Sequence, residues 1–324
     1  MSIVFFHFPG CVAVLDDDAA YLESLALVMS GKRHMAFYAR QQPCIDRILA
    51  ERVEWHMLMQ QKHGWINHWR AGRPMLAKIL ADSIASRPPY GLVKVLVVDY
   101  AMPGKNGLQV LQELPNLTAD RILLTGQADT QIAVAAFNSH LIEQYIPKQS
   151  DNVGQRIAKS VDDMLLNVDV KKFDVWQAIF SAEQFAVLKQ LSYDNQLHKL
   201  LKTRWVEYVV LSEPFGVLGF NAQGRAGWLQ LETASSLKDT AEMALAQQVP
   251  AEFVAKMLHG DILLALELKQ ALGLEEIELA SRALRIDARS PVSAAWFDLP
   301  ESCSRSMADS YSHFLRAYKP SIID

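Results

Sequence analysis

The first half of the sequence predicts an α/β fold built on a doubly wound parallel sheet. Short apolar runs rich in β-branched residues alternate with amphipathic segments of helical spacing. Polar side chains stand where several of the apolar runs end. Strands that alternate with helices imply βαβ units with right-handed crossovers, and therefore a parallel sheet. With 324 residues, the chain has room for about two domains.

The elements of this half follow one another from residue 11. Predicted strands are "CVAVL" (11–15), "HMAFYA" (34–39), "KVLVVD" (94–99), "RILLTG" (121–126) and "EQYIPK" (143–148). Predicted helices are "AAYLESLALVMSG" (19–31), "GLQVLQEL" (107–114), "TQIAVAAFNSHL" (130–141) and "VGQRIAKSVDDMLLN" (153–167). The run 94–99 is apolar up to its last residue, as expected of a central strand covered on both faces.

Charged and hydroxyl side chains stand at four of the strand ends. Asp16 and Asp17 follow the first strand, Asp99 ends the third, Thr125 the fourth and Lys148 the fifth. In parallel α/β sheets, ligands bind at the carboxyl ends of the strands. A buried acid is costly unless it has a partner or a task. The pattern predicts one site that gathers these groups.

Four motifs together resemble the receiver domain of two-component response regulators. They are "VLDDD" (14–18), the Asp-x-x-Met-Pro-x-x-x-Gly of "DYAMPGKNG" (99–107), "ILLTG" (122–126) and "YIPK" (145–148). The resemblance covers roughly residues 10–165 and implies a flavodoxin-like, five-stranded parallel sheet. Two features depart from the family pattern: the long stretch between the acidic pair and Asp99, and Gln149 in place of the usual proline. Pro147 precedes the lysine instead, which an edge strand can accept.

The resemblance implies a Mg²⁺ site. Three adjacent carboxylates repel one another without a cation, and hard oxygen ligands suit Mg²⁺. The expected ligands are Asp16, Asp17, Asp99 and, by the family pattern, the main-chain carbonyl of Ala101. Taken alone, Asp99 could instead be a helix N-cap.

The resemblance also assigns the phosphoryl chemistry. Asp99 is the expected phosphoacceptor, forming an aspartyl phosphate. Lys148 is expected to pair with the phosphoryl oxygens and Thr125 to hydrogen-bond one of them, while the small Gly126 leaves room for the donor. Thr125 and Tyr145 match the family's switch positions and are expected to move inward on phosphorylation. Individually, these residues could equally be a strand threonine, a packed tyrosine and a solvated lysine.

A long insertion separates the second and third strands. The sequence predicts helices over 44–62, 65–70 and 74–86, with a break at Gly64. The expected plan is a receiver domain over 1–168 with a helical insertion at about 44–90, followed by a second domain over 169–324. The tryptophans of the insertion suggest an exposed surface for a partner or a dimer. Packing onto its own domain is the alternative, and metal binding by its histidines (His56, His63 and His68) is a weaker one.

The second half predicts an α+β domain with a short antiparallel sheet. A helical stretch (173–205) precedes three strands, "VEYVVLS" (206–212), "FGVLGFN" (215–221) and "RAGWLQLE" (225–232). Helices follow to about 281, then two late strands, "LRIDA" (284–288) and "AAWFDLP" (294–300), and a closing helix, "DSYSHFLRAYK" (309–319). The order of elements resembles a PAS-like sensory fold only loosely. His198 could suggest phosphotransfer, although a lone helical histidine is usually structural.

Composition excludes several classes of protein. The formal charge is −4, and residues 171–324 carry 16 Lys+Arg against 19 Asp+Glu, which argues against DNA binding. No apolar run reaches the length of a membrane span. Three scattered cysteines suit a reducing cytoplasm rather than a disulfide framework. No separate catalytic signature is recognisable, so the chain is not predicted to be an enzyme beyond accepting, and self-hydrolysing, a phosphoryl group.

These observations together predict a cytoplasmic two-component response regulator. Phosphorylation of Asp99 with Mg²⁺ would shift a two-state receiver and change protein–protein contacts of the insertion or the second domain. The expected partners are a histidine kinase or phosphotransfer protein, a protein output partner and a second copy in a homodimer. Two alternatives stay open for the second domain: a small-molecule sensor, and a DNA-binding output.

Overall fold

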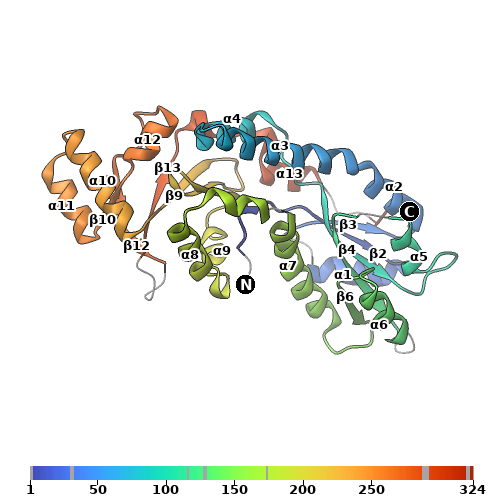
Figure 1. Cartoon of the computed structure of the whole chain (residues 1–324). Helices are drawn as coiled ribbons and strands as arrows, with labels where there is room; N and C mark the ends of the chain where they lie inside the picture. Colours follow the sequence, from blue (N-terminus) through green and yellow to red (C-terminus); the bar gives the residue numbers. More distant parts are fainter. Residues whose placement is uncertain are drawn as a thin grey trace. The chain divides into compact units, whose positions relative to one another are not determined.

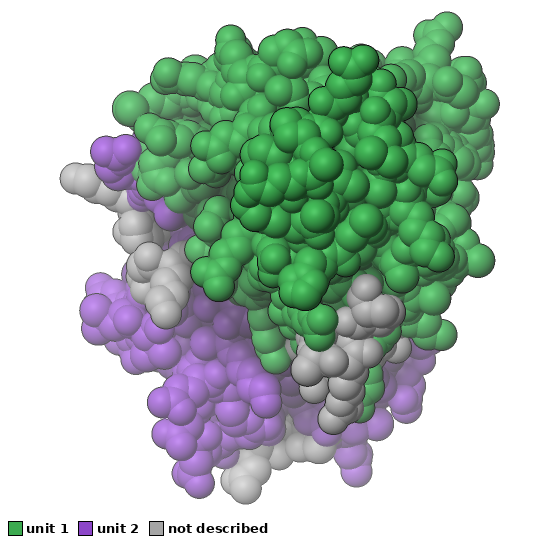
Figure 2. Space-filling view, turned by 90° about the vertical axis from the view of Figure 1, so that its left-hand side faces the viewer, with its two compact units in different colours: residues 1–8, 61–88, 172–313 green, residues 9–60, 89–171, 314–324 purple. Residues whose placement is uncertain are grey.

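The computed structural model describes residues 3–29, 33–114, 117–126, 130–172, 174–286, 292–318 and 322–323. The chain divides into two compact units, coloured separately in Figure 2. One unit comprises residues 9–60, 89–171 and 314–324 and is called the receiver unit below. The other comprises residues 1–8, 61–88 and 172–313 and is called the output unit. The chain passes from the receiver unit to the output unit at 171/172, and three stretches lie outside the two continuous ranges expected for the domains: residues 1–8, 61–88 and 314–324.

The receiver unit is built on a parallel sheet of six strands in the order β14-β3-β2-β4-β5-β6. Its strands are β2 (Cys11–Leu15), β3 (His34–Tyr38), β4 (Val93–Asp99), β5 (Asp120–Thr125), β6 (Gln144–Pro147) and β14 (Ile322–Ile323). Every pairing in it is parallel. The five predicted strands are confirmed. The sixth, β14, comes from the end of the chain and has only two residues, too few to show a strand pattern in the sequence. Pro147 lies on the edge strand β6, where its missing N–H costs no ladder hydrogen bond.

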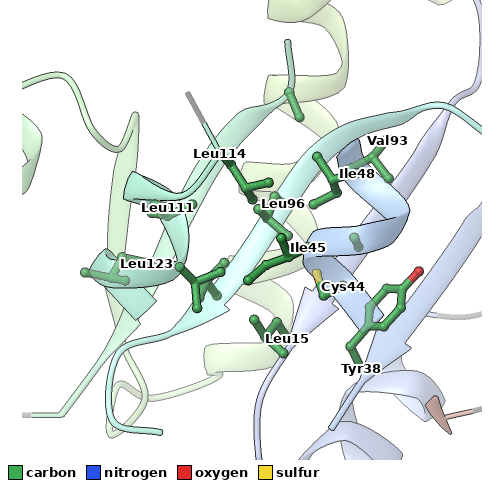
Figure 3. Close-up of a cluster of buried hydrophobic side chains, with 14 of the residues drawn as sticks. Leu15, Tyr38, Cys44, Ile45, Ile48, Val93, Leu96, Leu111, Leu114 and Leu123 are labelled. Atoms are coloured by element: carbon green, nitrogen blue, oxygen red, sulfur yellow. The ribbon is translucent and has the colours of Figure 1, made fainter. Parts of the chain in front are cut away.

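Helices cover both faces of this sheet (Figure 1). They are α1 (Ala19–Met29), α2 (Gln41–Ala50), α5 (Gly107–Gln112), α6 (Thr130–Asn138) and α7 (Val153–Lys172). α1 and α7 pack on one face through a buried cluster that includes Leu22 and Ile157. α2, α5 and α6 pack on the other face, and Figure 3 shows Ile45, Leu96 and Leu111 within that cluster. Each fully buried aliphatic side chain contributes about 2 kcal/mol to the stability of the fold. Packing on both faces therefore holds the strands, and the strand ends that carry the site, in place.

The insertion differs from its predicted helices. α2 ends at Ala50, and a single helix, α3 (Arg52–Arg70), runs through Gly64 without a break. The chain instead changes helix at Glu51, whose buried carboxylate accepts hydrogen bonds from Arg47 Nε (2.6 Å) and from the Val93 amide (2.7 Å). The predicted break at Gly64 was wrong because one glycine costs a helix only about 1 kcal/mol.

Two of the three tryptophans of the insertion are not exposed, and Trp69 is half-buried. Trp65 is 2% exposed and Trp55 is also buried. Trp65 belongs to the output unit, where its ring lies 6.0 Å from that of Phe6 and 6.3 Å from that of Trp176. Its indole N–H donates to Asp82 Oδ2 of α4 (Met75–Ala85) at 2.7 Å. The insertion thus supplies core to the output unit.

Replacing Gly64 with alanine is expected to stabilise the protein by about 0.8 kcal/mol, because the glycine is helical and a Cβ there meets nothing within 4 Å. Urea unfolding of the two proteins measures the difference. A destabilised variant would contradict the continuous helix α3.

The output unit contains an antiparallel sheet in the order β1-β7-β8-β9-β13-β12. Its strands are β1 (Phe6–His7), β7 (Glu207–Ser212), β8 (Phe215–Phe220), β9 (Ala226–Glu232), β12 (Leu284–Arg285) and β13 (Ser293–Asp298). The predicted meander of three strands is confirmed as β7, β8 and β9. A separate two-stranded sheet pairs β10 (Ile262–Leu264) with β11 (Ala280–Arg282). The late strand at "LRIDA" is confirmed only over 284–285, and residues 287–288 lie outside the described residues.

The helices of the output unit pack around these sheets. They are α4, α8 (Ala182–Leu191), α9 (Gln196–Leu201), α10 (Ala234–Ala246), α11 (Ala251–His259) and α12 (Leu266–Leu272). The last helix, α13 (Tyr311–Ala317), begins in this unit, and its residues from 314 onward belong to the receiver unit. α10, α11 and α12 share a core with β10 that includes Met257 and Leu264. Among the described residues, no helix is both long and apolar enough to cross a membrane.

A buried carboxylate in this unit makes its stability depend on pH. Burial raises the pKa of Glu232 to about 7, although Ser236 and Gln230 donate hydrogen bonds to it. Between pH 4.5 and 7 the folded protein therefore holds a proton that the unfolded chain has released. The contribution of Glu232 to stability is accordingly greatest below this window and falls as pH rises through it.

Replacing Glu232 with glutamine is expected to remove this slope and to leave the variant about 3 kcal/mol more stable than wild type at pH 8. Urea unfolding at pH 5, 6.5 and 8 measures both curves. Parallel curves for the two proteins would show that Glu232 does not carry the dependence.

Candidate functional site

Three carboxylates meet at the carboxyl edge of the parallel sheet. Asp16 and Asp17 follow β2, and Asp99 ends the neighbouring strand β4, so the pairing of Leu15 with Val98 brings the strand ends level. Asp16 is 0% exposed and Asp99 is 3% exposed, whereas Asp17 is open to solvent. One oxygen from each carboxylate lies within 4.8 Å of the others. The structure therefore brings together the acids that the sequence predicted.

Lys148 neutralises the two buried acids. Its Nζ lies 2.7 Å from Asp16 Oδ2 and 2.8 Å from Asp99 Oδ1. Burial raises the pKa of Asp16, and the ammonium of Lys148 opposes that rise. Burial by itself would lower the pKa of Lys148, but its hydrogen bonds to Asp16 and Asp99 hold it above its ordinary value. The lysine is thus held cationic between two carboxylates, at the position where an anion approaching Asp99 would meet it.

Thr125 lies beside this ion pair. The residue ends β5, and its carbonyl accepts the Lys148 amide at 2.9 Å. Its hydroxyl is buried and has no hydrogen-bond partner among the described residues. A buried hydroxyl normally finds a partner, so this one is available to a ligand. The next residue, Gly126, is half-buried.

Tyr145 is placed further along the edge strand. It lies on β6 opposite Leu123 of β5, and it packs half-buried against the cluster under α5 and α6. Gln149 is exposed just after Lys148. No contact joins Tyr145 to the carboxylates in this structure, and its role as a switch stays a prediction.

The loop after Asp99 is held by backbone hydrogen bonds. The Tyr100 amide donates to Leu124 O (2.9 Å), and the Gly107 amide donates to Tyr100 O (3.0 Å). Asn106 caps α5 by accepting the Gln109 amide at 3.0 Å, and the Gln109 side chain accepts the Asn106 amide at 2.9 Å. This capping box starts the helix directly behind the acidic residue.

Close packing explains why position 107 of the motif is a glycine. A Cβ on Gly107 would lie 2.3 Å from the carbonyl oxygen of Asp99 and 3.0 Å from a methyl of Val98. Only glycine lets α5 approach the end of β4 so closely. Ala101 lies exposed in the loop between them, and the role of its carbonyl as a ligand stays a prediction.

One site residue was missed from the sequence. The ring of Tyr21, in the first turns of α1, has Lys148 Nζ 4.7 Å from its centroid, within cation–π range. Its hydroxyl is buried without a hydrogen-bond partner among the described residues. A tyrosine in a helix of apolar spacing gives no signal of such a role.

The residues present fit a hard divalent cation. Mg²⁺ prefers carboxylate, carbonyl and water oxygens, and the site offers three carboxylates, two of them buried with only one lysine between them. Within the described part of the chain, this is the one cluster of its kind. His56, His63 and His68 form no such group there, so the alternative of a histidine metal site finds no support.

His198 is engaged elsewhere. It is buried on α9, with Nδ1 2.8 Å from the hydroxyl of Tyr208 and its ring 4.9 Å from that of His7. Its burial and packing favour a structural role over phosphotransfer.

Known structures share this fold. No protein-family model matches the sequence, and no curated protein sequence matches it with significance. The structure of the Legionella pneumophila response regulator LqsR is similar over 98% of this chain and 98% of that chain, with 20% sequence identity and a TM-score of 0.73. A receiver domain from Clostridium thermocellum (14% identity, TM-score 0.30) covers 48% of this chain and 94% of its own. A CheY-like receiver domain from Methanospirillum hungatei JF-1 (14% identity, TM-score 0.31) covers 49% and 96%.

The likeness to LqsR establishes the fold. It confirms, at the level of fold, the resemblance to response-regulator receivers that the four motifs predicted. It also reaches further than the motifs, because it spans the second half of the chain, which resembles a PAS-like fold only loosely in sequence. The two receiver domains have TM-scores too low to add to this argument.

Proposed function

We propose that this chain is a two-component response regulator that accepts a phosphoryl group on Asp99. The observation that carries the proposal is the pairing of Lys148 with both Asp16 and Asp99 at the carboxyl edge of the sheet. This arrangement presents a nucleophilic carboxylate, a fixed cation and an unpartnered hydroxyl, Thr125, at one point. Phosphoryl transfer needs little more than a nucleophile, charge neutralisation and positioning.

The proposed reaction is an in-line displacement. An oxygen of Asp99 forms a bond to phosphorus while the bond from phosphorus to the donor breaks, and the donor group leaves with the bonding electrons. Lys148 turns from Asp99 to the phosphoryl oxygens, and the Thr125 hydroxyl donates to one of them. Asp16, Asp17, Asp99 and the carbonyl of Ala101 would hold Mg²⁺, which when bound neutralises charge on the phosphoryl oxygens. A histidine kinase or phosphotransfer protein is the proposed donor.

The proposed output is a shift between two states. With Thr125 drawn to the phosphoryl group, Tyr145 turns from its half-buried place on β6 toward the space the hydroxyl leaves. The shift is limited by how differently the phosphoryl group interacts with the two states. The free, buried cysteines Cys11, Cys44 and Cys303 suit a cytoplasmic protein. No separate enzymatic activity is proposed, and the output is a protein–protein contact, either with a partner or with a second copy.

The test is the intact mass of the full chain after incubation with acetyl phosphate and Mg²⁺. We expect one phosphoryl adduct on the wild type and on a control variant at an exposed helical acid, Asp46→Asn, and none on Asp99→Asn. Chelating the metal should abolish the adduct. Size-exclusion chromatography of the same samples reports assembly. An unmodified wild type, or an adduct that survives in Asp99→Asn, would overturn the proposal.

A further inference from the structure

A cleft in the output unit opens where its sheet loses a partner strand. β12 pairs with β13 only through Leu284 with Ala294 and Arg285 with Ser293. The chain before β12 forms β11, which pairs with β10 instead. The ladder on this side of β13 therefore stops after two pairs, and a cleft of about 990 Å³ lies between residues 281–284 and 296–299. Its volume is at the upper end of the range of ligand-binding pockets.

The unpaired backbone of β13 faces this cleft. The amide of Leu299 donates to Ala226 O, which continues the ladder between β13 and β9. Because hydrogen-bonded pairs alternate along an antiparallel ladder, the amides and carbonyls of Trp296 and Asp298 point to the opposite edge. No hydrogen bond to these groups is found among the described residues. An edge of this kind is a template for one more strand.

The ring of Trp296 lines the cleft. The guanidinium carbon of Arg204 lies 4.7 Å from the centroid of the half-buried Trp296 ring. Behind it, the Trp205 ring meets Trp296 edge-on at 4.9 Å. Trp296 is thus held between two neighbours. Its side chain therefore loses little rotamer entropy when a ligand packs against it.

The rim of the cleft is acidic. Its carboxylates are exposed and form no ion pair within the described part of the chain; they are Glu276, Glu278, Asp298 and Glu301. Against these four, the cleft has two arginines, Arg204 and Arg282, which leaves a formal charge of −2. Low-dielectric walls of one predominant sign concentrate the field and attract the opposite charge.

We propose that this cleft binds an extended, basic segment of a partner protein, which adds a strand to the free edge of β13. The main chain of the segment pairs with Trp296 and Asp298, and its lysine or arginine side chains reach the four carboxylates. Nucleic acid is disfavoured, because its phosphates would meet that acidic rim. This inference rests on the proposed function in one respect only: the segment bound in the cleft is taken to belong to the output partner. The binding itself needs no phosphorylation.

The experiment measures fluorescence anisotropy of two labelled peptides, KVKVK and EVEVE, titrated with the full-length protein at low salt. We expect KVKVK to bind at least tenfold more tightly than EVEVE. Reversing an exposed rim charge, Asp298→Lys, should weaken KVKVK binding at least tenfold. The matched control is Glu242→Lys, an exposed acid on α10 outside the cleft, which should bind as the wild type does. A KVKVK peptide whose alternate amides are methylated should bind at least tenfold less tightly than KVKVK itself, because it cannot pair with the edge.

Equal binding of the two peptides, or equal weakening by Asp298→Lys and Glu242→Lys, would overturn the proposal. Undiminished binding of the methylated peptide would overturn the strand addition. The same titration on Asp99→Asn separates the two proposals. Asp99→Asn should lose the adduct and still bind KVKVK as the wild type does. A wild type that binds KVKVK preferentially but forms no adduct would overturn only the proposed function, and a wild type that forms the adduct but does not discriminate between the peptides would overturn only the cleft.

Discussion

Replacing Lys148 with methionine is expected to destabilise the receiver unit by about 3 kcal/mol at neutral pH without divalent cations. The substitution keeps much of the side-chain volume but leaves Asp16 and Asp99 buried and close together with no cation between them. Removing one partner of a buried ion pair typically costs about 3–5 kcal/mol. Lys148 is partly exposed, so the lower end applies. Hydrogen exchange of β2 and β4 amides under native conditions measures the loss in this unit alone.

Millimolar Mg²⁺ should recover part of that stability, because a divalent cation replaces the lost charge between the carboxylates. The matched control is Lys105→Met, which removes an exposed ion pair with Glu113 at 2.7 Å and should change stability by no more than about 0.5 kcal/mol. Equal effects of the two substitutions would show that Lys148 does not neutralise the buried acids. The same variant should also form the phosphoryl adduct at least a hundredfold more slowly than the wild type.

Replacing Gly107 with alanine is expected to cost the receiver unit about 3 kcal/mol, since overpacking against backbone forces α5 or the end of β4 to shift. The added carbon would lie 2.3 Å from Asp99 O, and a backbone atom cannot rotate away as a side chain can. Adduct formation should slow as well, because the shift moves the nucleophile. Hydrogen exchange of α5 and β4 amides measures the stability.

Gly64→Ala is the steric control for this substitution: urea unfolding should show the opposite sign, because its Cβ meets open space. A Gly107→Ala protein within about 0.5 kcal/mol of the wild type would contradict the steric reason given for the motif glycine.

The receiver half was predictable because two independent signals coincide there. Apolar runs fix strands such as β4, and parallel pairing then brings the ends of β2 and β4 together, so that Asp16 and Asp99 had to be neighbours. Contacts that depend on side-chain direction could not be predicted. The cation–π approach of Lys148 to Tyr21 is one of them.

The rest could not be predicted because it depends on pairings distant in sequence. β14 is two residues long and joins β3 from the far end of the chain. β1 pairs with β7 across some two hundred residues. Trp65 was expected to be exposed because its partners, Phe6 and Trp176, are also far from it in sequence. Local periodicity carries no information about such contacts.

Asp99 is the residue proposed to carry the phosphoryl group. Borohydride reduces an aspartyl phosphate to homoserine, so the most direct measurement is mass-spectrometric sequencing of the reduced protein after incubation with acetyl phosphate and Mg²⁺. We expect homoserine at position 99 and at no other aspartate. Homoserine at another position, or at none while the intact mass shows an adduct, would contradict it.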